Sequence, residues 1–208
     1  MSLDIFDSED QKSYWSARYE EDRTGWDIGY PSTPLKNYID QLTDKSIRIL
    51  IPGAGNAYEA AYLFEQGFSN TVILDISPIP LEAFSNRFPK FPKEQLVNEN
   101  FFSYQEQYDL ILEQTFFCSM PPLPKNRKTY ALQMSKLLKP GGKLVGLWFD
   151  IPLTGDLEKR PFGGTKEEYL GYLESYFWVK TFATAHNSIP PRAGNELFGI
   201  FVKTTSPE

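Results

Sequence analysis

Three residues of one segment have the types and the spacing of a cofactor-binding site. Gly53 and Gly55 follow an apolar run, and Asp75 lies 20 residues beyond Gly55, at the end of a second apolar run. Glycine has no β-carbon, so a ligand can approach the backbone closely at this turn. A carboxylate after the second strand can accept hydrogen bonds from ribose hydroxyl groups. The segment therefore predicts a strand, a glycine turn, a helix and a second strand that together bind a nucleotide-type cofactor.

Tyr58 narrows the kind of cofactor. It stands where a dinucleotide fingerprint has its third glycine, which permits close packing of the helix against the strand. A bulky tyrosine obstructs that packing and so disfavours NAD and FAD. S-adenosylmethionine has a ribose but no pyrophosphate and does not need this glycine, so it is the cofactor that we expect. The alternative, that the glycine turn is only a tight connection between strand and helix, stays open at this point.

Strands and helices alternate along the part of the chain that must position these residues. Regular alternation predicts a parallel sheet with helices on both faces. The last part differs, because a helix is followed by two β-rich runs with a Pro/Gly loop between them, which predicts an antiparallel pair at the sheet edge. We therefore expect an α/β fold with a doubly wound, mostly parallel seven-stranded sheet and a C-terminal antiparallel hairpin. The expected strands are 47–51, 71–75, 96–97, 108–112, 143–149, 178–185 and 197–203, and the expected helices are 57–66, 80–86, 124–138 and 166–176.

Length and composition limit the classes of function. At 208 residues the chain suits one α/β domain over residues 1–208. Its net charge of −6 and the lack of a Lys/Arg cluster disfavour a nucleic-acid partner, because that affinity comes largely from neutralised phosphates. No apolar run approaches the roughly 20 residues that span a bilayer, so no membrane partner is expected. The expected partner is a small molecule.

The N-terminal residues and the single cysteine bear on location and assembly. The first ten residues lack the basic region and the apolar core of a signal peptide. One cysteine, Cys118, cannot form an internal disulfide. We therefore expect a cytoplasmic protein that acts as a monomer or a weak dimer, and we predict no metal site.

Four motifs carry a resemblance to a known family: Trp26-Asp27-Ile28-Gly29 with Pro31, Ile51-Pro52-Gly53-Ala54-Gly55, Tyr108-Asp109-Leu110-Ile111 with Thr115-Phe116-Phe117-Cys118, and Ile189-Pro190-Pro191-Arg192-Ala193-Gly194. With them the chain resembles class I S-adenosylmethionine-dependent methyltransferases from Tyr14 to about Val202. More specifically, it is similar to the thiopurine S-methyltransferase superfamily and, within it, to plant-type halide and thiol methyltransferases. The resemblance implies a Rossmann-like fold, S-adenosylmethionine as cofactor, and residues 1–30 as a cover over it.

The resemblance also implies a set of cofactor contacts. The implied residues are Trp15, Tyr19, Trp26, Gly53, Ala54, Gly55, Asp75, Ile76, Asn100, Phe101 and Gln114. The relatives commonly have cysteine at Ala54, glycine near Ala57, an acid at Asn100 and an aromatic residue at Gln114. The carbonyl oxygen of Asn100 can still accept a hydrogen bond from the adenine amino group, as the acid would. The change at Gln114 lies closer to the reacting end and bears more on the substrate.

Methyl transfer from a sulfonium is an in-line displacement, so the site mainly has to align the nucleophile, the methyl carbon and the leaving sulfur. A thiol already supplies some thiolate at neutral pH, and a halide needs no deprotonation, so a base is optional and no catalytic residue is assigned. The expected function is methyl transfer to a small thiol or sulfide, a halide or a related soft nucleophile. Two alternatives stay open: a non-catalytic module that binds S-adenosylmethionine, and a nicotinamide dehydrogenase.

The acceptor pocket is expected at the carboxyl ends of the strands, walled by the loops 150–164 and 186–194. The candidate substrate contacts are Phe116, Phe117, Phe162 and Arg192. Arg192 is as readily a solvated surface residue as a donor to an anionic substrate. Cys118 is expected to pack inertly, and His186 is expected at the surface in preference to a substrate contact.

Overall fold

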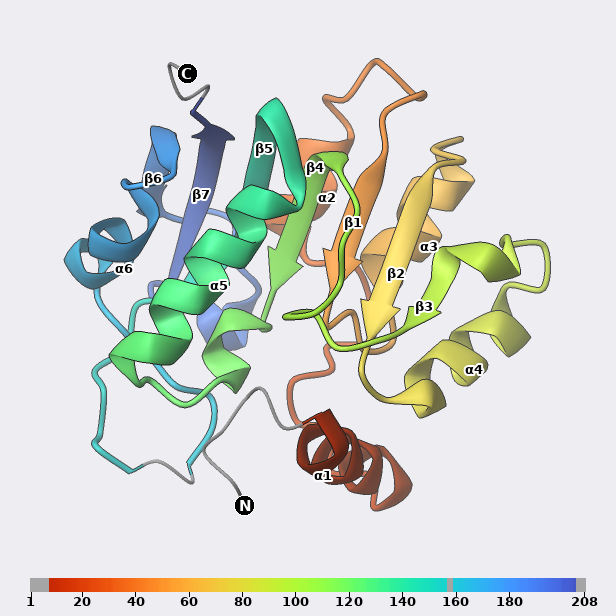
Figure 1. Ribbon diagram of the computed structural model, residues 1–208, viewed down its shortest axis with the longest axis horizontal. Helices are drawn as coiled ribbons and strands as arrows, with labels where there is room; N and C mark the ends of the chain where they lie inside the picture. Colours follow the sequence, from red (N-terminus) through yellow and green to blue (C-terminus); the bar gives the residue numbers. More distant parts are fainter. Residues whose placement is uncertain (1–7, 157–158, 205–208) are drawn as a thin grey trace.

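The computed structural model describes residues 8–156 and 159–204 and shows, within them, a seven-stranded sheet with helices on both faces (Figure 1). The strand order is β3-β2-β1-β4-β5-β7-β6. Neighbouring strands from β3 to β5 are parallel, and β7 lies antiparallel between β5 and β6. The expected fold class is therefore confirmed, including the antiparallel C-terminal strands.

The bounds of most elements lie within a few residues of those predicted. The strands are β1 (Ile49–Pro52), β2 (Thr71–Asp75), β3 (Leu96–Asn98), β4 (Tyr108–Gln114), β5 (Leu138–Phe149), β6 (Phe177–Thr184) and β7 (Glu196–Lys203). The α-helices are α1 (Ser8–Glu20), α2 (Thr33–Ile39), α3 (Tyr58–Glu65), α4 (Pro78–Arg87), α5 (Pro124–Lys136) and α6 (Lys166–Leu173). None of the helices in the described ranges is both long and apolar enough to cross a bilayer.

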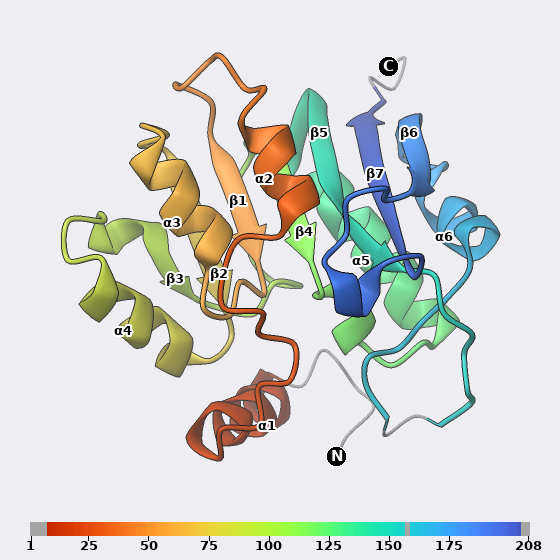
Figure 2. The same ribbon diagram turned by 180° about the vertical axis from the view of Figure 1, so that it is seen from behind.

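Two helical layers bury the two faces of the sheet. The helices α5 and α6 cover one face, and α2, α3 and α4 cover the other (Figures 1 and 2). Tyr130 and Met134 of α5 pack in one apolar cluster, and Leu35 of α2 and Leu63 of α3 pack in the other. Because both faces are covered, every residue of β1 and β2 is buried, as a continuous apolar run predicts.

The segment before the expected fifth strand was assigned wrongly. Lys-Pro-Gly-Gly was expected to close the helix, with the strand beginning at Lys143, but β5 already begins at Leu138. The partner register shifts from Tyr108 and Leu138 to Leu110 and Lys143, so the extra residues form a bulge within β5. Gly141 has a φ of 75°, a left-handed backbone that suits such an irregular strand.

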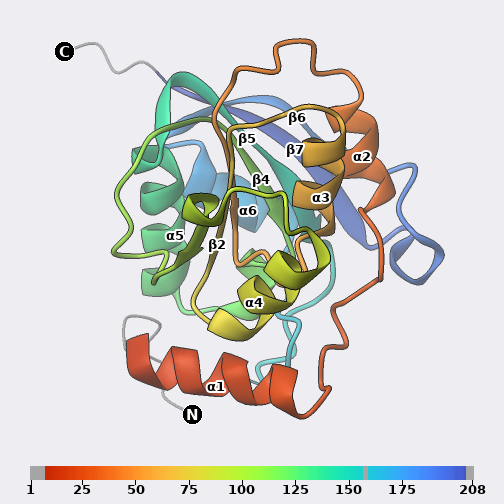
Figure 3. The same cartoon turned by 90° about the vertical axis from the view of Figure 1, so that its right-hand side faces the viewer.

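Helix α1 does not belong to either layer. It lies across the carboxyl ends of the parallel strands, as the side view shows (Figure 3). Its Ser16 hydroxyl lies 3.0 Å from the hydroxyl of Ser77, the residue that precedes α4. The N-terminal residues are therefore placed over the strand ends at which ligands of open α/β sheets bind.

Candidate active site

The turn after β1 brings glycine backbone against aromatic side chains. Gly53 and Gly55 have φ values of 57° and 54°, in the left-handed region that favours glycine. A β-carbon on Gly53 would lie 2.2 Å from the ring of Phe116. One on Gly55 would lie 3.1 Å from the hydroxyl oxygen of Tyr19. The turn therefore needs glycine both for its backbone and for the close approach of side chains.

Asp75, the last residue of β2, is buried and bonded to that turn. Its Oδ2 accepts a hydrogen bond from the backbone N–H of Gly55 at 3.0 Å, and its Oδ1 accepts one from Ser77 at 2.9 Å. Burial raises the pKa of the carboxyl group to about 6, although these hydrogen bonds favour its charged form. A carboxylate oxygen can accept more than one hydrogen bond, so Asp75 can also receive ligand hydroxyl groups.

A cavity of about 520 Å³ lies between α1 and the carboxyl ends of the strands. Eight of the eleven predicted cofactor contacts line it: Trp15, Tyr19, Trp26, Gly53, Asp75, Ile76, Asn100 and Phe101. The other three, Ala54, Gly55 and Gln114, line a neighbouring hollow of about 50 Å³ that shares Trp26 and Gly53 with the cavity. The structure thus gathers the predicted residues in one region but divides them between two hollows.

Three aromatic residues, Trp15, Tyr19 and Trp26, roof the cavity, and Tyr14 packs against Trp15 beside it. We call these four residues the aromatic cover. Their rings meet edge to face, with centroid distances of 5.0 Å for Tyr14 and Trp15, 5.6 Å for Trp15 and Trp26, and 5.7 Å for Tyr19 and Trp26. Edge-to-face pairs add about 0.5–1.5 kcal/mol each beyond the area that they bury. Burial also raises the pKa of Tyr19, and the nearby Asp75 adds to this. The cover is therefore packed upon itself and upon the site.

Asp27, which follows Trp26 of the aromatic cover, forms hydrogen bonds with residues just after the glycine turn. Its Oδ2 accepts hydrogen bonds from the side-chain amide of Asn56 and from the hydroxyl of Tyr58 at 3.3 Å. Its Oδ1 accepts one from the backbone N–H of Gly29 at 2.7 Å. Sequence reasoning quoted Asp27 within a motif and used Tyr58 only to argue against a dinucleotide. The signal for this contact was the tyrosine at the third-glycine position.

A buried acid shapes the loop after β4. Glu113 is fully buried, and its Oε1 accepts hydrogen bonds from the backbone N–H groups of Phe116 and Phe117, each at 2.9 Å. Burial raises the pKa of this carboxyl group to about 8. Thr115, which lies between Glu113 and Phe116 in the sequence, has a left-handed backbone with a φ of 57°. Glu113 therefore holds the turn that places the Phe116 ring over Gly53.

The side of the cavity beyond β4 and β5 is where an acceptor would meet the cofactor, and we call it the acceptor end. Its walls are Phe116, Cys118, Ser119, Met120, Phe149, Arg160, Pro161, Pro191 and Arg192. The loops 150–164 and 186–194 contribute to it as expected. Phe117 and Phe162 do not line the cavity. Phe117 packs against Tyr130 with a ring distance of 4.7 Å, and Phe162 is buried.

Cys118 and His186 have the inert placements that the sequence suggested. The Cys118 thiol lines the cavity and donates to the carbonyl oxygen of Thr115 at 3.2 Å. Burial raises the pKa of this thiol, and nearby Glu113 raises it further, so the reactive thiolate is disfavoured. His186 is exposed and does not line the cavity.

Arg192 is buried, and its contacts are structural ones. Its Nη1 lies 3.3 Å from Oε1 of the buried Glu196, which balances its charge. Its Nη2 donates to the backbone carbonyl oxygen of Trp26 at 3.0 Å. The side chain therefore ties the loop 186–194 to the aromatic cover, and its placement at the surface, one of the two alternatives, is wrong. Arg160 and Arg18, which sequence reasoning missed, also line the cavity, and no pattern around either residue marked it.

Comparison with known proteins agrees with this geometry. The family model described as thiopurine S-methyltransferase matches residues 10–205. The chain is 29% identical to a probable thiol methyltransferase 2 of Arabidopsis thaliana, over 99% of this chain and 92% of that protein. It is 30% identical to a thiocyanate methyltransferase 1 of the same plant, over 91% of this chain and 84% of that protein.

A solved structure agrees with the fold. The 1,6-didemethyltoxoflavin-N1-methyltransferase of Burkholderia thailandensis, determined with bound S-adenosylhomocysteine, superposes with a TM-score of 0.74. The match covers 93% of this chain and 87% of that chain, at 18% sequence identity. At this identity the likeness concerns the fold alone, and it places the carboxyl ends of the strands in the same architecture.

Proposed function

Because the chain belongs to the thiopurine S-methyltransferase family and is an S-adenosylmethionine-dependent S-methyltransferase, we propose that it methylates a small soft nucleophile, namely a thiol, a sulfide or a halide ion. The named substrates of two relatives support the sulfur acceptors, since one is a thiol methyltransferase and the other a thiocyanate methyltransferase. The halide belongs with them because it is another polarisable nucleophile that needs no base.

The residues that line the cavity fit the cofactor. Asp75 presents carboxylate oxygens for the ribose hydroxyl groups, and Asn100 presents an amide for the adenine amino group. Gly53 leaves room for close approach at the turn. When bound, S-adenosylmethionine supplies an electrophilic methyl group on a sulfonium. The rings of Trp15 and Trp26 attract such a cation by about 0.5–2 kcal/mol.

The observation that carries the acceptor class is the composition of the acceptor end. Phe116, Met120, Phe149 and the two prolines exclude water and offer apolar, polarisable surface. The carboxylates among the described residues that line the cavity are Asp75 and Glu99. Asp75 ends β2 and Glu99 follows β3, on the other side of the strand order. A nucleophile that reacts without a positioned base fits this arrangement.

We also infer that residues 1–208 act as one methyltransferase domain in which the N-terminal 30 residues cover the cofactor. The support is the aromatic cover itself, which roofs the cavity and is held there by hydrogen bonds to the rest of the domain. Asp27 bonds to Asn56 and Tyr58, and Arg192 bonds to the carbonyl oxygen of Trp26. Opening of such a cover would let ligands enter, and closure would keep water from the reacting atoms.

A product-resolved screen tests the proposed function. The purified protein is incubated with methyl-labelled S-adenosylmethionine and, separately, with hydrosulfide, small organic thiols, thiocyanate, iodide and thiopurines. We expect volatile or thioether products with at least one sulfur or halide acceptor, and none with an Asp75→Ala variant at low cofactor concentration. If none of these acceptors were methylated, or if thiocyanate and thiopurines were methylated only on nitrogen, the proposed acceptor class would be wrong.

A further inference from the structure

The side chain of Glu113, near the carboxyl end of β4, is enclosed on every side. It is fully buried, and a β-carbon on Gly146 of the neighbouring strand β5 would lie 2.8 Å from its Cβ atom. Its Oε1 accepts the hydrogen bonds from the backbone N–H groups of Phe116 and Phe117. Its Oε2 is also buried and has no hydrogen-bond partner within residues 8–156 and 159–204. One carboxyl oxygen is thus fully used, whereas the other meets no polar group.

The charged groups around Glu113 already have partners. Glu196 of β7, whose charge acts on Glu113, pairs with Arg192 at 3.3 Å. On the side of α5, Arg127 pairs with Glu168 at 2.6 Å. The other titratable groups that act on one another here have raised pKa values and are uncharged at neutral pH: Cys118, Tyr130 and Tyr169. A negative charge on Oε2 would therefore gain no new ion pair from these two arginines.

This arrangement favours the neutral form of Glu113. A buried charge without a partner costs far more than a buried neutral group. Burial raises the pKa of the carboxyl group to about 8, the hydrogen bonds from Phe117 and Phe116 oppose this, and Glu196 adds to it. Because Oε1 accepts both N–H groups, Oε2 carries the proton of the neutral form.

The turn that Glu113 holds sets the position of one ring between the two parts of the cavity. The Phe116 ring packs edge to face against Phe101, with a centroid distance of 5.0 Å, and lies 2.2 Å from the place of a β-carbon on Gly53. Gly53 and Phe101 are predicted cofactor contacts, whereas Phe116 is a wall of the acceptor end. A shift of the turn would therefore move this ring relative to both the cofactor and the acceptor.

We propose that Glu113 is a positioning residue for methyl transfer, whose neutral carboxyl group fixes the turn 115–117 and so holds the Phe116 ring at the boundary between cofactor and acceptor. Loss of the proton places a charge on the enclosed Oε2, and the turn must open before water can reach it. Opening displaces the ring, and an in-line displacement loses rate when the reacting groups are no longer aligned. The inference concerns methyl transfer to any acceptor, and it rests on the proposed function only because its kinetic test uses iodide.

The pH dependence of turnover with iodide tests the requirement for the neutral form, because iodide itself does not titrate. With saturating methyl-labelled S-adenosylmethionine, the wild-type kcat/KM for iodide should fall about tenfold between pH 7.5 and pH 9. Glu113→Gln keeps a neutral acceptor for the two N–H groups and cannot ionise. It should retain at least about a third of the wild-type kcat/KM at pH 7 and lose less than about twofold over the same pH range.

Glu106→Gln is the matched control. It makes the same substitution at the opposite end of the sheet, where Glu106 is exposed and pairs with Arg48. Its pH profile should follow that of wild type within about twofold at each pH. The inference is overturned if wild type shows no alkaline loss, or if Glu113→Gln loses activity with pH as wild type does.

Glu113→Leu and Phe116→Leu separate positioning from a general loss of stability. Glu113→Leu leaves the two N–H groups without an acceptor, so kcat at pH 7 should fall at least about tenfold, while S-adenosylhomocysteine affinity stays within about threefold. In a Phe116→Leu background, the same substitution should lower kcat by less than about threefold, because the ring that it positions is absent. Fully additive effects would mean that Glu113 does not act through Phe116, and the inference would fail.

Hydrogen exchange of the Phe116 and Phe117 amides tests the turn without turnover. In protein saturated with S-adenosylhomocysteine at pH 7, both amides should exchange at least about tenfold faster in Glu113→Leu than in wild type. Glu113→Gln should match wild type within about threefold. Unchanged exchange in a folded Glu113→Leu variant would contradict the role of Glu113. If this variant does not fold, the pH profiles of wild type and Glu113→Gln still decide.

The exchange measurement also distinguishes this inference from the proposed function. If iodide and the other soft nucleophiles are not methylated, the proposed acceptor class fails, and exchange of the two amides alone decides whether Glu113 holds the turn. If iodide is methylated but neither the pH profile nor the exchange depends on Glu113, only the inference fails.

Discussion

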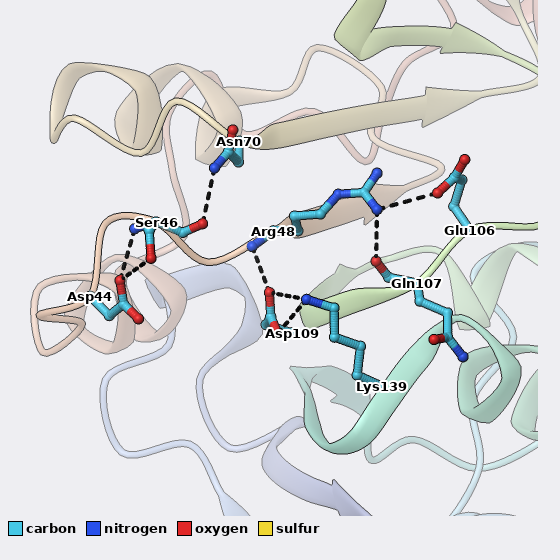
Figure 4. A network of polar contacts seen from close by, with 8 residues as sticks. All are labelled: Asp44, Ser46, Arg48, Asn70, Glu106, Gln107, Asp109 and Lys139. Carbon is cyan, nitrogen blue, oxygen red and sulfur yellow. Dashed lines mark hydrogen bonds and ion pairs between the residues drawn. The ribbon is translucent and has the colours of Figure 1, made fainter.

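The two ends of the sheet use polar side chains in opposite ways. At the amino ends of β1, β4 and β5, charged groups meet partners of opposite charge (Figure 4). The Nζ atom of Lys139 lies 2.8 Å from Oδ1 of Asp109, and the Nη1 atom of Arg48 lies 3.2 Å from Oε2 of Glu106. At the carboxyl ends, Asp75 accepts hydrogen bonds from the backbone N–H groups of Gly55 and Ser77. The aspartate at the amino ends is therefore paired with a cation, whereas the aspartate at the carboxyl ends is held by backbone hydrogen bonds and lines the cavity.

The pKa values of Asp109 and Asp75 shift in opposite directions and show this difference between the two ends. Partial burial disfavours the charge of Asp109, but the hydrogen bonds from Lys139 and from the backbone of Arg48 outweigh it and lower its pKa. Burial dominates at Asp75 and raises its pKa to about 6. Hydrogen bonds from the hydroxyl groups of a ligand would favour the charged form of such a buried carboxylate.

The largest expected effect comes from removing the cover at the carboxyl ends. Deleting residues 1–30 should reduce turnover by at least about a hundredfold with every acceptor, because the cavity loses its roof and water reaches the reacting atoms. Turnover is measured at saturating cofactor, with circular dichroism to show that the sheet still folds. Normal turnover in a folded truncated protein would contradict the role of the cover.

A matched pair of tryptophans refines this test. Trp26 lies in the aromatic cover, whereas Trp178 on the edge strand β6 is 61% exposed and distant from the cavity. Trp26→Ala should lower cofactor affinity and turnover, and Trp178→Ala should leave both unchanged. Equal effects of the two variants would indicate a general loss of stability.

The next effect concerns the two aspartates. Asp75→Ala should weaken S-adenosylhomocysteine binding by one to two factors of ten, since each charge-assisted hydrogen bond is worth about 1.5–3 kcal/mol before water compensates. Asp109→Ala, at the opposite end, should leave that affinity within about twofold. Calorimetry on the two folded variants measures both. Unchanged affinity in Asp75→Ala would remove Asp75 from the site.

The smallest expected effect is an opposite pH dependence of stability. Between the unfolded pKa of about 3.9 and the folded value near 6, native Asp75 binds more protons than the unfolded chain. Its contribution therefore falls as the pH rises through this range, by at most about 3 kcal/mol. Asp109 has a lowered pKa, so its contribution is present above about 3.9 and is lost as the pH falls below it.

Urea unfolding at a series of pH values measures this difference. The difference in the free energy of unfolding between wild type and Asp75→Ala should be larger at pH 4.5 than at pH 7. The reason is that the wild type loses the stabilising contribution of protonated Asp75 as the pH rises. The penalty of Asp109→Ala should be about 0–1 kcal/mol above pH 5, because that ion pair is partly exposed. Parallel pH profiles of the two variants would remove the contrast between the ends.

Most of the fold could be predicted because its signals are local. Each strand of the parallel part is a short apolar run bounded by turn residues, and alternation with helices fixes the sheet type. The errors fell where local signals conflict. Lys-Pro-Gly-Gly before Lys143 has the composition of a helix end, yet strand pairing with β4 draws it into β5 as a bulge. No helix was assigned to 33–39, because the run is only seven residues long.

In the candidate site, too, the residues with local signals were predicted, whereas the direction of neighbouring side chains was not. Its residues near the glycine turn were found from spacing, since Gly55 and Asp75 are joined by one strand-helix-strand unit. Phe117 was expected to face the substrate, but its ring turns into the core against Tyr130. Neighbouring Phe116 faces the cavity instead. Two adjacent phenylalanines give the sequence no means of telling which ring points inward.

The sequence by itself determined the sheet, the glycine turn and the acid that follows β2, because these depend on periodicity and on spacings of about 20 residues. The tertiary structure alone decided which arginines line the cavity and which residues hold them. Arg192 meets Trp26 across 166 residues of chain, and Arg160 meets Tyr14 across 146. Contacts at such separations depend on how loops from different strands pack together. The partners of an arginine are a property of that packing, so residue type alone does not reveal them.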